Sequence, residues 1–137
     1  MTKTACPPSG ASIAAGRRHA GRRADLSGRA AEDAVAAHYA HRGGSLVARR
    51  WRGSCGEIDL VIRDGEDLAF VEVKRGRSFA RAAERLSAAQ IGRIMATASE
   101  FLGTQPAGQL TPMRLDLATV DAIGRVDVLE NAFRSEE

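Results

Sequence analysis

The most regular pattern along the chain is a pair of runs, 57–63 and 67–74, in which apolar and polar residues alternate. An Asp64-Gly65 pair stands between them, and Asp-Gly between two alternating runs is a strong signal for a β-hairpin. Three acids and a lysine stand inside the expected strands: Glu57, Asp59, Glu72 and Lys74. Because side chains alternate between the two faces of a strand, all four lie on one face of the predicted sheet.

The turn that closes the hairpin has two possible positions. If Gly65-Glu66 form a two-residue turn, Asp59 lies directly opposite Glu72; if Asp64-Gly65 form it, Glu57 takes that place and Asp59 lies diagonally. Like charges opposed across a hairpin destabilise it unless a cation lies between them. A divalent metal ion is the simplest such cation. The alternative interpretation is a salt-bridge ladder on an exposed face of the sheet.

The other expected elements frame this hairpin. An alanine-rich helix is expected at 28–42, and a second helix has its apolar residues at helical spacing up to the stop at Gly103. Further strands are expected at 45–51, 113–120 and 125–129, with an arginine-rich connection at 76–82. The order of helix, three strands, helix and two strands predicts an α/β fold with a central mixed sheet flanked by helices. Arg114 and Asp116 are interpreted as an exposed structural pair on a strand.

Length and composition narrow the function classes. The 137 residues suit one domain, and no apolar run approaches the roughly 20 residues of a membrane span. Aromatic residues make up 4% of the chain, which argues against an aromatic stacking surface for single-stranded nucleic acid. Cys6 and Cys55 have no metal-ligand spacing, and we interpret them as unpaired thiols of a cytoplasmic protein.

Charge is unevenly distributed along the chain. Residues 1–29 hold six basic residues against Asp25, a net +5, so the chain total of +3 leaves −2 for the remainder. Residues 1–27 lack apolar periodicity and are expected to form a flexible basic arm, with 28–137 as the folded domain. The arm suits nonspecific contact with phosphates, and a solvated leader without a role fits it equally.

A local basic stretch follows the hairpin directly. We predict that this stretch contacts nucleic acid, together with Gln90 at the start of the second helix. The basic residues concerned are Arg75, Arg77, Arg81 and Arg85. Gln90 has an alternative role, since Ser87-Ala88-Ala89-Gln90 fits a capping box that would occupy its side chain.

The pairing of Asp59 with Glu72-Val73-Lys74 resembles the PD-(D/E)XK motif of metal-dependent nucleases. The resemblance implies that Asp59, Glu72 and the carbonyl of Val73 bind Mg²⁺ or Mn²⁺, a hard ion that needs few carboxylates. It also implies that Lys74 orients a water molecule or stabilises an oxyanion. Glu57 would support this set or simply face solvent.

A wider set of segments resembles the YraN-like family of small bacterial proteins, over about Gly28 to Asp127. The segments are Gly28-x-x-Ala31-Glu32, Gly56-Glu57-Ile58-Asp59-Leu60, Phe70-Val71-Glu72-Val73-Lys74 and Met113-Arg114-Leu115-Asp116. The resemblance implies a restriction-endonuclease-like fold related to archaeal Holliday junction resolvases. It also implies that Glu32, on the first helix, reaches the metal site; the alternative is an acid that favours the helix dipole. Family members often carry lysine where this chain has Gln90, so a phosphate contact there would be weaker.

These observations predict a metal-dependent endonuclease that hydrolyses duplex or branched DNA. Because duplex and branched DNA have two strands, a two-fold homodimer is expected. The alternative is a noncatalytic DNA-binding or scaffolding module of the same fold. An RNA-directed nuclease would share the site and would differ in its dependence on the 2′-hydroxyl.

Overall fold

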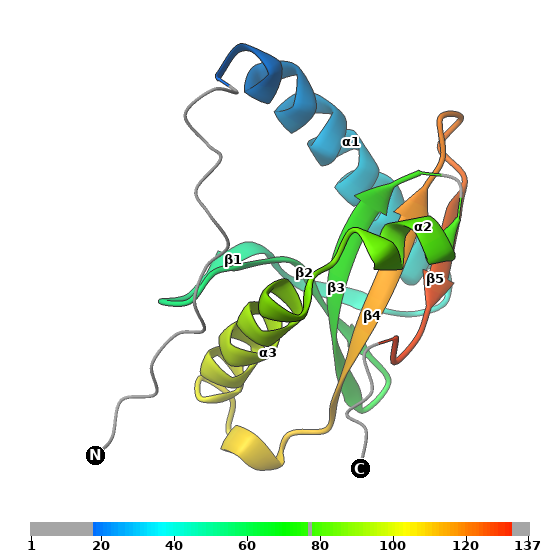
Figure 1. The fold of residues 1–137 in the computed structure, drawn as a ribbon. Coiled ribbons are helices and arrows are strands. Elements are labelled where there is room, and N and C mark those ends of the chain that lie inside the picture. Colours follow the sequence, from blue (N-terminus) through cyan, green and yellow to red (C-terminus); the bar gives the residue numbers. More distant parts are fainter. Residues whose placement is uncertain (1–17, 77, 133–137) are drawn as a thin grey trace.

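A computed structural model of the chain describes residues 18–76 and 78–132 (Figure 1). The helices are α1 (Arg18–His41), α2 (Phe79–Glu84), α3 (Ala88–Leu102) and the short 3-10 helix η2 (Gly108–Leu110). The strands are β1 (Ser45–Arg52), β2 (Glu57–Asp64), β3 (Asp67–Arg75), β4 (Met113–Val120) and β5 (Val126–Leu129). They form one sheet in the order β1-β2-β3-β4-β5, in which β3 and β4 are parallel and the other neighbours antiparallel. The predicted α/β class with a central mixed sheet flanked by helices is confirmed, and it agrees with a restriction-endonuclease-like architecture.

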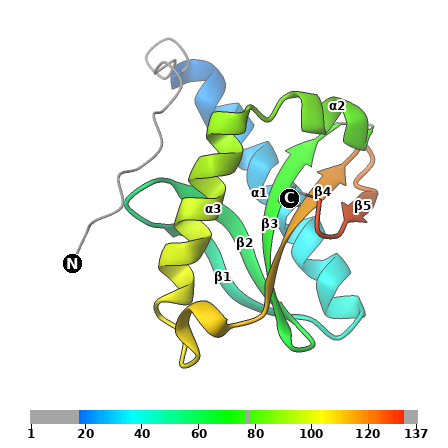
Figure 2. The same ribbon diagram turned by 60° about the horizontal axis from the view of Figure 1, so that its bottom comes forward.

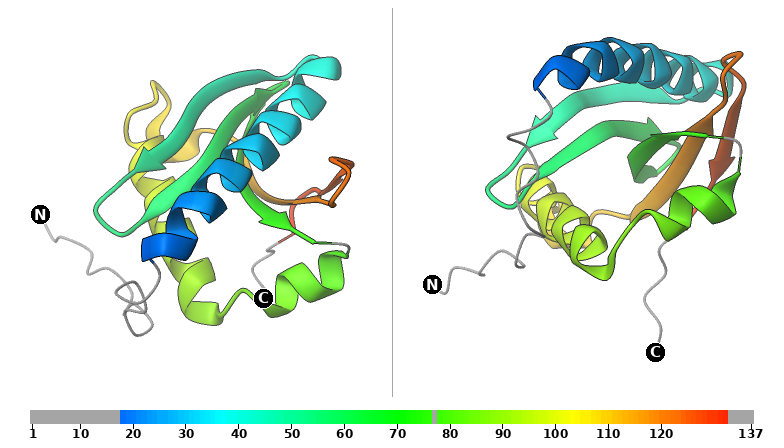
Figure 3. Two further views of the ribbon diagram at one scale, coloured as in Figure 1. Left: turned by 90° about the horizontal axis from the view of Figure 1, so that it is seen from above. Right: turned by 45° about the horizontal axis from the view of Figure 1, so that its top comes forward.

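The sheet is the middle of three layers. Helix α1 covers one face, and α2 and α3 cover the other (Figure 3, right). Figure 2 shows α3 crossing in front of β1 and β2. On the α1 side, Val35 and Tyr39 pack against Leu60 and Val71 of the sheet. On the α3 side, the core includes Ile58, Val61, Leu68, Phe70, Ile94, Phe101 and Leu102. Burial of both sheet faces therefore accounts for the long apolar stretches within β2 and β3.

The hairpin between β2 and β3 takes the first of the two predicted registers. Asp64 pairs with Asp67, so Gly65 and Glu66 form the two-residue turn. Gly65 has a φ of 66°, a conformation that glycine adopts without steric cost. The register continues through Leu60 paired with Val71, and one further step along it places Asp59 opposite Glu72.

Helix α3 begins and ends as the sequence predicts. Ser87 and Gln90 form the expected capping box, in which the Ser87 side chain accepts from the Gln90 backbone N–H and the Gln90 side chain accepts from the Ser87 N–H. Gly103 follows the last helical residue. Helix α2 is an addition to the prediction, because it lies partly within the segment expected to be a connection. Ser78 caps it by accepting from the N–H of Arg81 at 3.2 Å.

The N-terminal boundary differs from the prediction. Helix α1 starts at Arg18, earlier than the start expected near Gly28, while residues 1–17 of the predicted arm lie outside the described residues. The arm itself stays a prediction.

Cys55 is disulfide-bonded, so the expectation of a free thiol is wrong there; Cys6 lies outside the described residues. In the described part of the chain, no helix is both long and apolar enough to cross a membrane.

Candidate functional site

The predicted acids meet where β2 and β3 separate. Regular pairing of the two strands ends at Leu60 and Val71. Beyond that point the backbone N–H of Val73 donates to Oδ2 of Asp59 at 2.8 Å, so a side chain takes the place of a ladder acceptor. Glu72 and Lys74 follow on β3, with Lys74 Nζ 3.4 Å from Glu72 Oε2. The alternation of the hairpin therefore brings Asp59, Glu72 and Lys74 together.

The electrostatics of this pair of acids are unfavourable for two negative charges. Burial raises the pKa of Asp59 to about 6, against the opposing effect of the Val73 hydrogen bond, and the nearby charge of Glu32 raises it further. Burial and then the charge of Asp59 raise the pKa of Glu72 to about 7, while Lys74 lowers it. A second cation would therefore stabilise the ionised pair.

Glu32 reaches the same place from helix α1. It is 5% exposed and lines a cavity of about 390 Å³ together with Asp59, Val73 and Lys74. Its carboxylate is paired with Arg50 of β1, whose Nε lies 3.0 Å from Oε1 and 3.3 Å from Oε2. The structure thus places Glu32 beside Asp59, and in an ion pair that the sequence did not predict.

The donor set fits a hard divalent cation that keeps most of its water. Across residues 18–76 and 78–132, no three His, Cys, Asp or Glu side chains are gathered as a ready-made metal cage. Asp59 and Glu72 supply two carboxylates, and Val73, whose carbonyl is the third predicted ligand, follows Glu72 directly in the chain. Mg²⁺ is commonly held by one or two carboxylates with water and a substrate phosphate in the remaining positions.

A smaller cavity of about 130 Å³ opens on the α3 side of Glu72. Its polar lining comes from Glu57, Glu72, Gln90 and Arg93. Glu57 also lies 3.6 Å from Arg52, and its side chain is 39% exposed, so this residue faces solvent as well as the cavity. Gln90 borders the site while its side chain serves the capping box. Arg93 was not predicted, although its spacing of three residues from Gln90 on one helix would have placed both on one face.

The basic stretch after β3 lines the neighbouring surface. Arg81 and Arg85 border a cavity of about 820 Å³ together with Gly76, Ser78 and Glu84. Arg85 also donates to the carbonyl of Arg75 at 2.8 Å, which ties helix α2 to the end of β3. Arg77, the remaining residue of the predicted basic stretch, lies outside the described residues.

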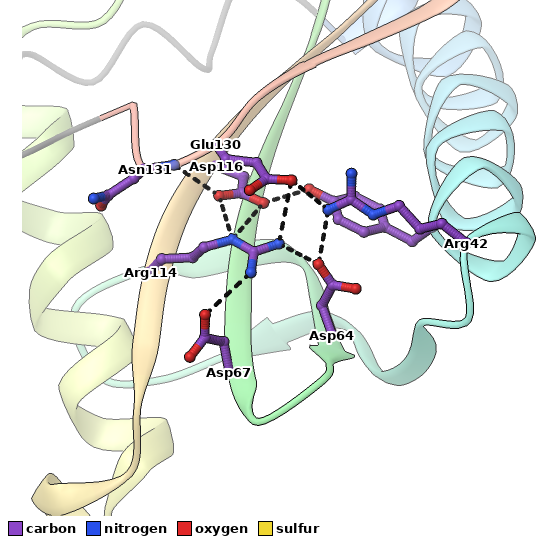
Figure 4. Close-up of polar contacts among 8 residues, drawn as sticks. Arg42, Asp64, Asp67, Arg114, Asp116, Glu130 and Asn131 are labelled. Carbon is purple, nitrogen blue, oxygen red and sulfur yellow. Dashed lines mark hydrogen bonds and ion pairs between the residues drawn. The ribbon is translucent and has the colours of Figure 1, made fainter.

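A second polar cluster lies at the other end of β3 (Figure 4). We call it the Arg114 network, and its members are Tyr39, Arg42, Asp64, Asp67, Arg114, Asp116, Glu130 and Asn131. The expectation that Arg114 and Asp116 form an exposed pair is wrong. Asp116 is fully buried and accepts from the Tyr39 hydroxyl at 2.6 Å, Arg114 Nε at 3.0 Å and the Asn131 backbone N–H at 3.0 Å.

Arg114 links this buried acid to the hairpin turn. Its guanidinium reaches Asp64 at 2.6 Å and Asp67 at 3.3 Å, and Arg42 reaches the same Asp64 at 2.7 Å. Hydrogen bonds from Arg114 hold the pKa of Asp64 below its usual range. The sequence did not reveal this network because Tyr39 and Asn131 lie far from Arg114 along the chain.

Comparison with known proteins places the chain among relatives. Residues 31–129 match the model of the family described as "Uncharacterised protein family UPF0102". A UPF0102 protein of Ruegeria pomeroyi is 58% identical over 113 residues, which cover 82% of this chain and 92% of that protein. A UPF0102 protein of Cereibacter sphaeroides is 54% identical over 107 residues, covering 78% of this chain and 92% of that protein. A third, from Dinoroseobacter shibae, is 50% identical over 119 residues, covering 87% and 89%. The chain therefore belongs to the UPF0102 family, which includes the YraN-like proteins that its sequence resembles.

Proposed function

We propose that this protein is a metal-dependent endonuclease that hydrolyses phosphodiester bonds of DNA. The observation that carries the proposal is the convergence of Asp59, Glu72 and Lys74 at the point where β2 and β3 separate. Burial raises the pKa of both carboxylates there, the charge of Asp59 raises that of Glu72 further, and a divalent cation would stabilise the ionised pair. The basic surface beside them, with Arg75, Arg81 and Arg85, suits a phosphate backbone.

Each residue has a separate part in this proposal. Asp59, Glu72 and the Val73 carbonyl would hold Mg²⁺ or Mn²⁺, with Glu32 close to them. When bound, the cation would make a water molecule more acidic and neutralise charge on the phosphate. Lys74, 3.4 Å from Glu72, would orient the attacking water or stabilise negative charge on the phosphate oxygens.

The partners follow from the substrate. Duplex and branched DNA present two strands, so we propose a two-fold dimer with one site in each subunit. The cytoplasm is the compartment that fits a DNA substrate in a bacterial cell. Both statements are tested separately from the chemistry, by the mass of the protein in solution and by cell fractionation.

The test is a cleavage assay on linear duplex, single-stranded and four-way-junction DNA with Mg²⁺ or Mn²⁺. Glu72→Ala and Lys74→Ala are compared with wild type, and the expected result is cleavage by wild type that both variants lose. Glu66→Ala is the matched control for the acid, because Glu66 is exposed in the turn of the same hairpin. Arg125→Ala is the control for the base, since its side chain is 80% exposed.

The same assay separates the alternative functions. DNA binding without cleavage, unaffected by Glu72→Ala, would favour the noncatalytic DNA-binding or scaffolding module. Cleavage of RNA, lost when the 2′-hydroxyl beside the scissile phosphate is replaced by hydrogen, would favour an RNA-directed nuclease. Cleavage retained in Glu72→Ala would show that the chemistry lies elsewhere on the protein.

A further inference from the structure

Arg50 has an unusual backbone conformation within a strand. Its φ is 51°, in the left-handed region that residues other than glycine, asparagine and aspartate seldom adopt. Its neighbours pair with β2 as Arg49 with Leu60 and Trp51 with Ile58, so Arg50 itself falls opposite Asp59. Such a conformation persists only where the surrounding structure enforces it, and it is often found at functional sites.

The side chain of Arg50 points to a residue of the proposed site. Its Nε donates to both carboxylate oxygens of Glu32, at 3.0 and 3.3 Å. The Glu32 side chain is 7% exposed and that of Arg50 is 29% exposed, so the pair is largely removed from solvent. A buried carboxylate needs such a partner, because an unpaired buried charge is strongly destabilising.

Glu32 therefore has two possible cationic partners within reach. It lines the same cavity as Asp59 and Lys74, and its charge acts on Asp59. The Nε–H of Arg50 occupies part of the lone-pair capacity of Glu32, and the guanidinium charge compensates the charge of the carboxylate, so a metal ion gains less from binding it. In the ion pair as observed, Asp59 and Glu72 are the acids of this site that no arginine among the described residues compensates in this way.

We propose that Arg50 is a positioning residue that holds the carboxylate of Glu32 out of the metal-binding set, so that a divalent cation bound at Asp59 and Glu72 competes with the guanidinium for Glu32. This inference rests on the proposed function, because it assumes a cation at Asp59 and Glu72. On this inference, Arg50 lowers the affinity of the site for a metal ion until Glu32 is released from the ion pair.

The test measures binding of Mn²⁺ alone by calorimetry, without DNA. Arg50→Asn removes the guanidinium and keeps a residue that tolerates positive φ; Arg50→Gly also relieves the backbone strain, which protects folding. Arg49→Asn is the matched control, because Arg49 lies on the same strand and pairs at the surface with Asp33 of the same helix. Its charge change equals that of Arg50→Asn. Far-UV circular dichroism verifies that every variant is folded.

Arg50→Asn and Arg50→Gly are expected to bind Mn²⁺ about tenfold more tightly than wild type, since apparent affinity is reduced by the fraction of molecules that are competent to bind. Arg49→Asn is expected to match wild type. Adding Glu32→Gln to Arg50→Asn is expected to remove the gain. Equal affinity of Arg50→Asn and Arg49→Asn, or a gain that survives Glu32→Gln, would overturn the inference.

The outcome for the proposed function is read separately. Binding that Asp59→Asn abolishes but Arg50→Asn leaves unchanged overturns the part of Arg50 and leaves the metal site intact. Binding that Asp59→Asn does not weaken, or no binding by any variant, overturns the metal site itself and the inference with it.

Discussion

The two ends of β3 carry polar clusters built from the same kinds of residue, yet the clusters differ in how their charges are compensated. At the turn end, the carboxylates of the Arg114 network each accept from an arginine, and the fully buried Asp116 has three donors. At the other end, burial and nearby acids raise the pKa values of Asp59 and Glu72: the charge of Glu32 acts on Asp59, and that of Asp59 acts on Glu72. Lys74 is the cation beside Glu72.

The difference teaches how to separate a structural cluster from a functional one. A network whose donors and acceptors match stabilises the native fold and has little to offer a ligand. Acids that are buried with insufficient counter-charge destabilise the metal-free fold and bind a cation in return. Helix α1 contributes to both clusters, through Tyr39 at one end and Glu32 at the other, and Arg42 follows directly after it. Substitutions at the two ends should therefore change stability in opposite directions.

Breaking the Arg114 network is expected to have the largest effect. Arg114→Met keeps the aliphatic part of the side chain and leaves the buried Asp116 without its cation, which should lower the free energy of unfolding by about 3–5 kcal/mol. Urea denaturation at pH 7 measures the change. Arg125→Met is the control, because Arg125 pairs with Asp121 at an exposed position and should change stability little. Equal effects of the two substitutions would show that the network contributes nothing beyond a surface ion pair.

Removing an acid from the candidate site should raise the free energy of unfolding. Glu72→Gln eliminates a poorly compensated charge, and its pKa of about 7 against an ordinary 4.5 implies a gain in stability of about 1–2 kcal/mol at pH 8 without metal. Calorimetry should also show that Glu72→Gln no longer binds Mg²⁺. Glu66→Gln makes the same charge change at an exposed position and should do neither. A loss of stability in Glu72→Gln would place this residue with the structural cluster.

The two clusters should also respond to pH in opposite ways. Because their pKa values are raised in the folded protein, Asp59 and Glu72 stabilise the fold when they are protonated. This contribution is fully present below about pH 4, and it is lost as the pH rises through about 6 for Asp59 and about 7 for Glu72. The lowered pKa of Asp64 contributes stability that is present above pH of about 4 and lost as pH falls below it.

Urea denaturation between pH 3 and pH 8 in the presence of a chelator separates these two effects. Glu72→Gln should flatten the decline above pH 6, by about 1–2 kcal/mol across that range, and Arg114→Met should flatten the decline on the acid side. Saturating Mg²⁺ should restore the stability of wild type at pH 8. A wild-type protein whose stability rises steadily from pH 5 to pH 8 without metal would contradict the assignment of Asp59 and Glu72.

Local patterns predicted the parts of the fold that depend on near neighbours in sequence. Alternation identified the hairpin, and Ser87 with Gln90 identified the start of α3. The register stayed open because Asp64-Gly65 and Gly65-Glu66 both suit a two-residue turn. Helix α2 was missed because its six residues are too few to show a helical repeat.

The candidate site was likewise predictable only where it depends on residues close together in the sequence. Asp59, Glu72 and Lys74 follow from the period of two along a strand. Arg50 could not be predicted, because arginine gives no sign of a positive φ and its partner Glu32 lies on another element. The buried state of Asp116 was equally hidden, since its burial depends on a hydroxyl 77 residues away. Contacts between elements decide such cases, and a single sequence does not encode them in any short pattern.

Gln90 has two possible roles, one structural and one at the candidate site, and the smallest of the expected effects distinguishes them. It lines the cavity beside Glu72, while its side chain accepts from the Ser87 N–H in the capping box. Gln90→Ala should lower the free energy of unfolding by about 0.5–1 kcal/mol through loss of this cap. Ser87→Ala breaks the same capping box from its other side, and Ser87 is exposed and lies outside that cavity. If capping is the whole role of Gln90, the two variants should lose similar stability and bind duplex DNA with equal affinity in Ca²⁺. Weaker DNA binding by Gln90→Ala than by Ser87→Ala would instead show a contact from its amide to the substrate, as predicted from its place at the start of α3.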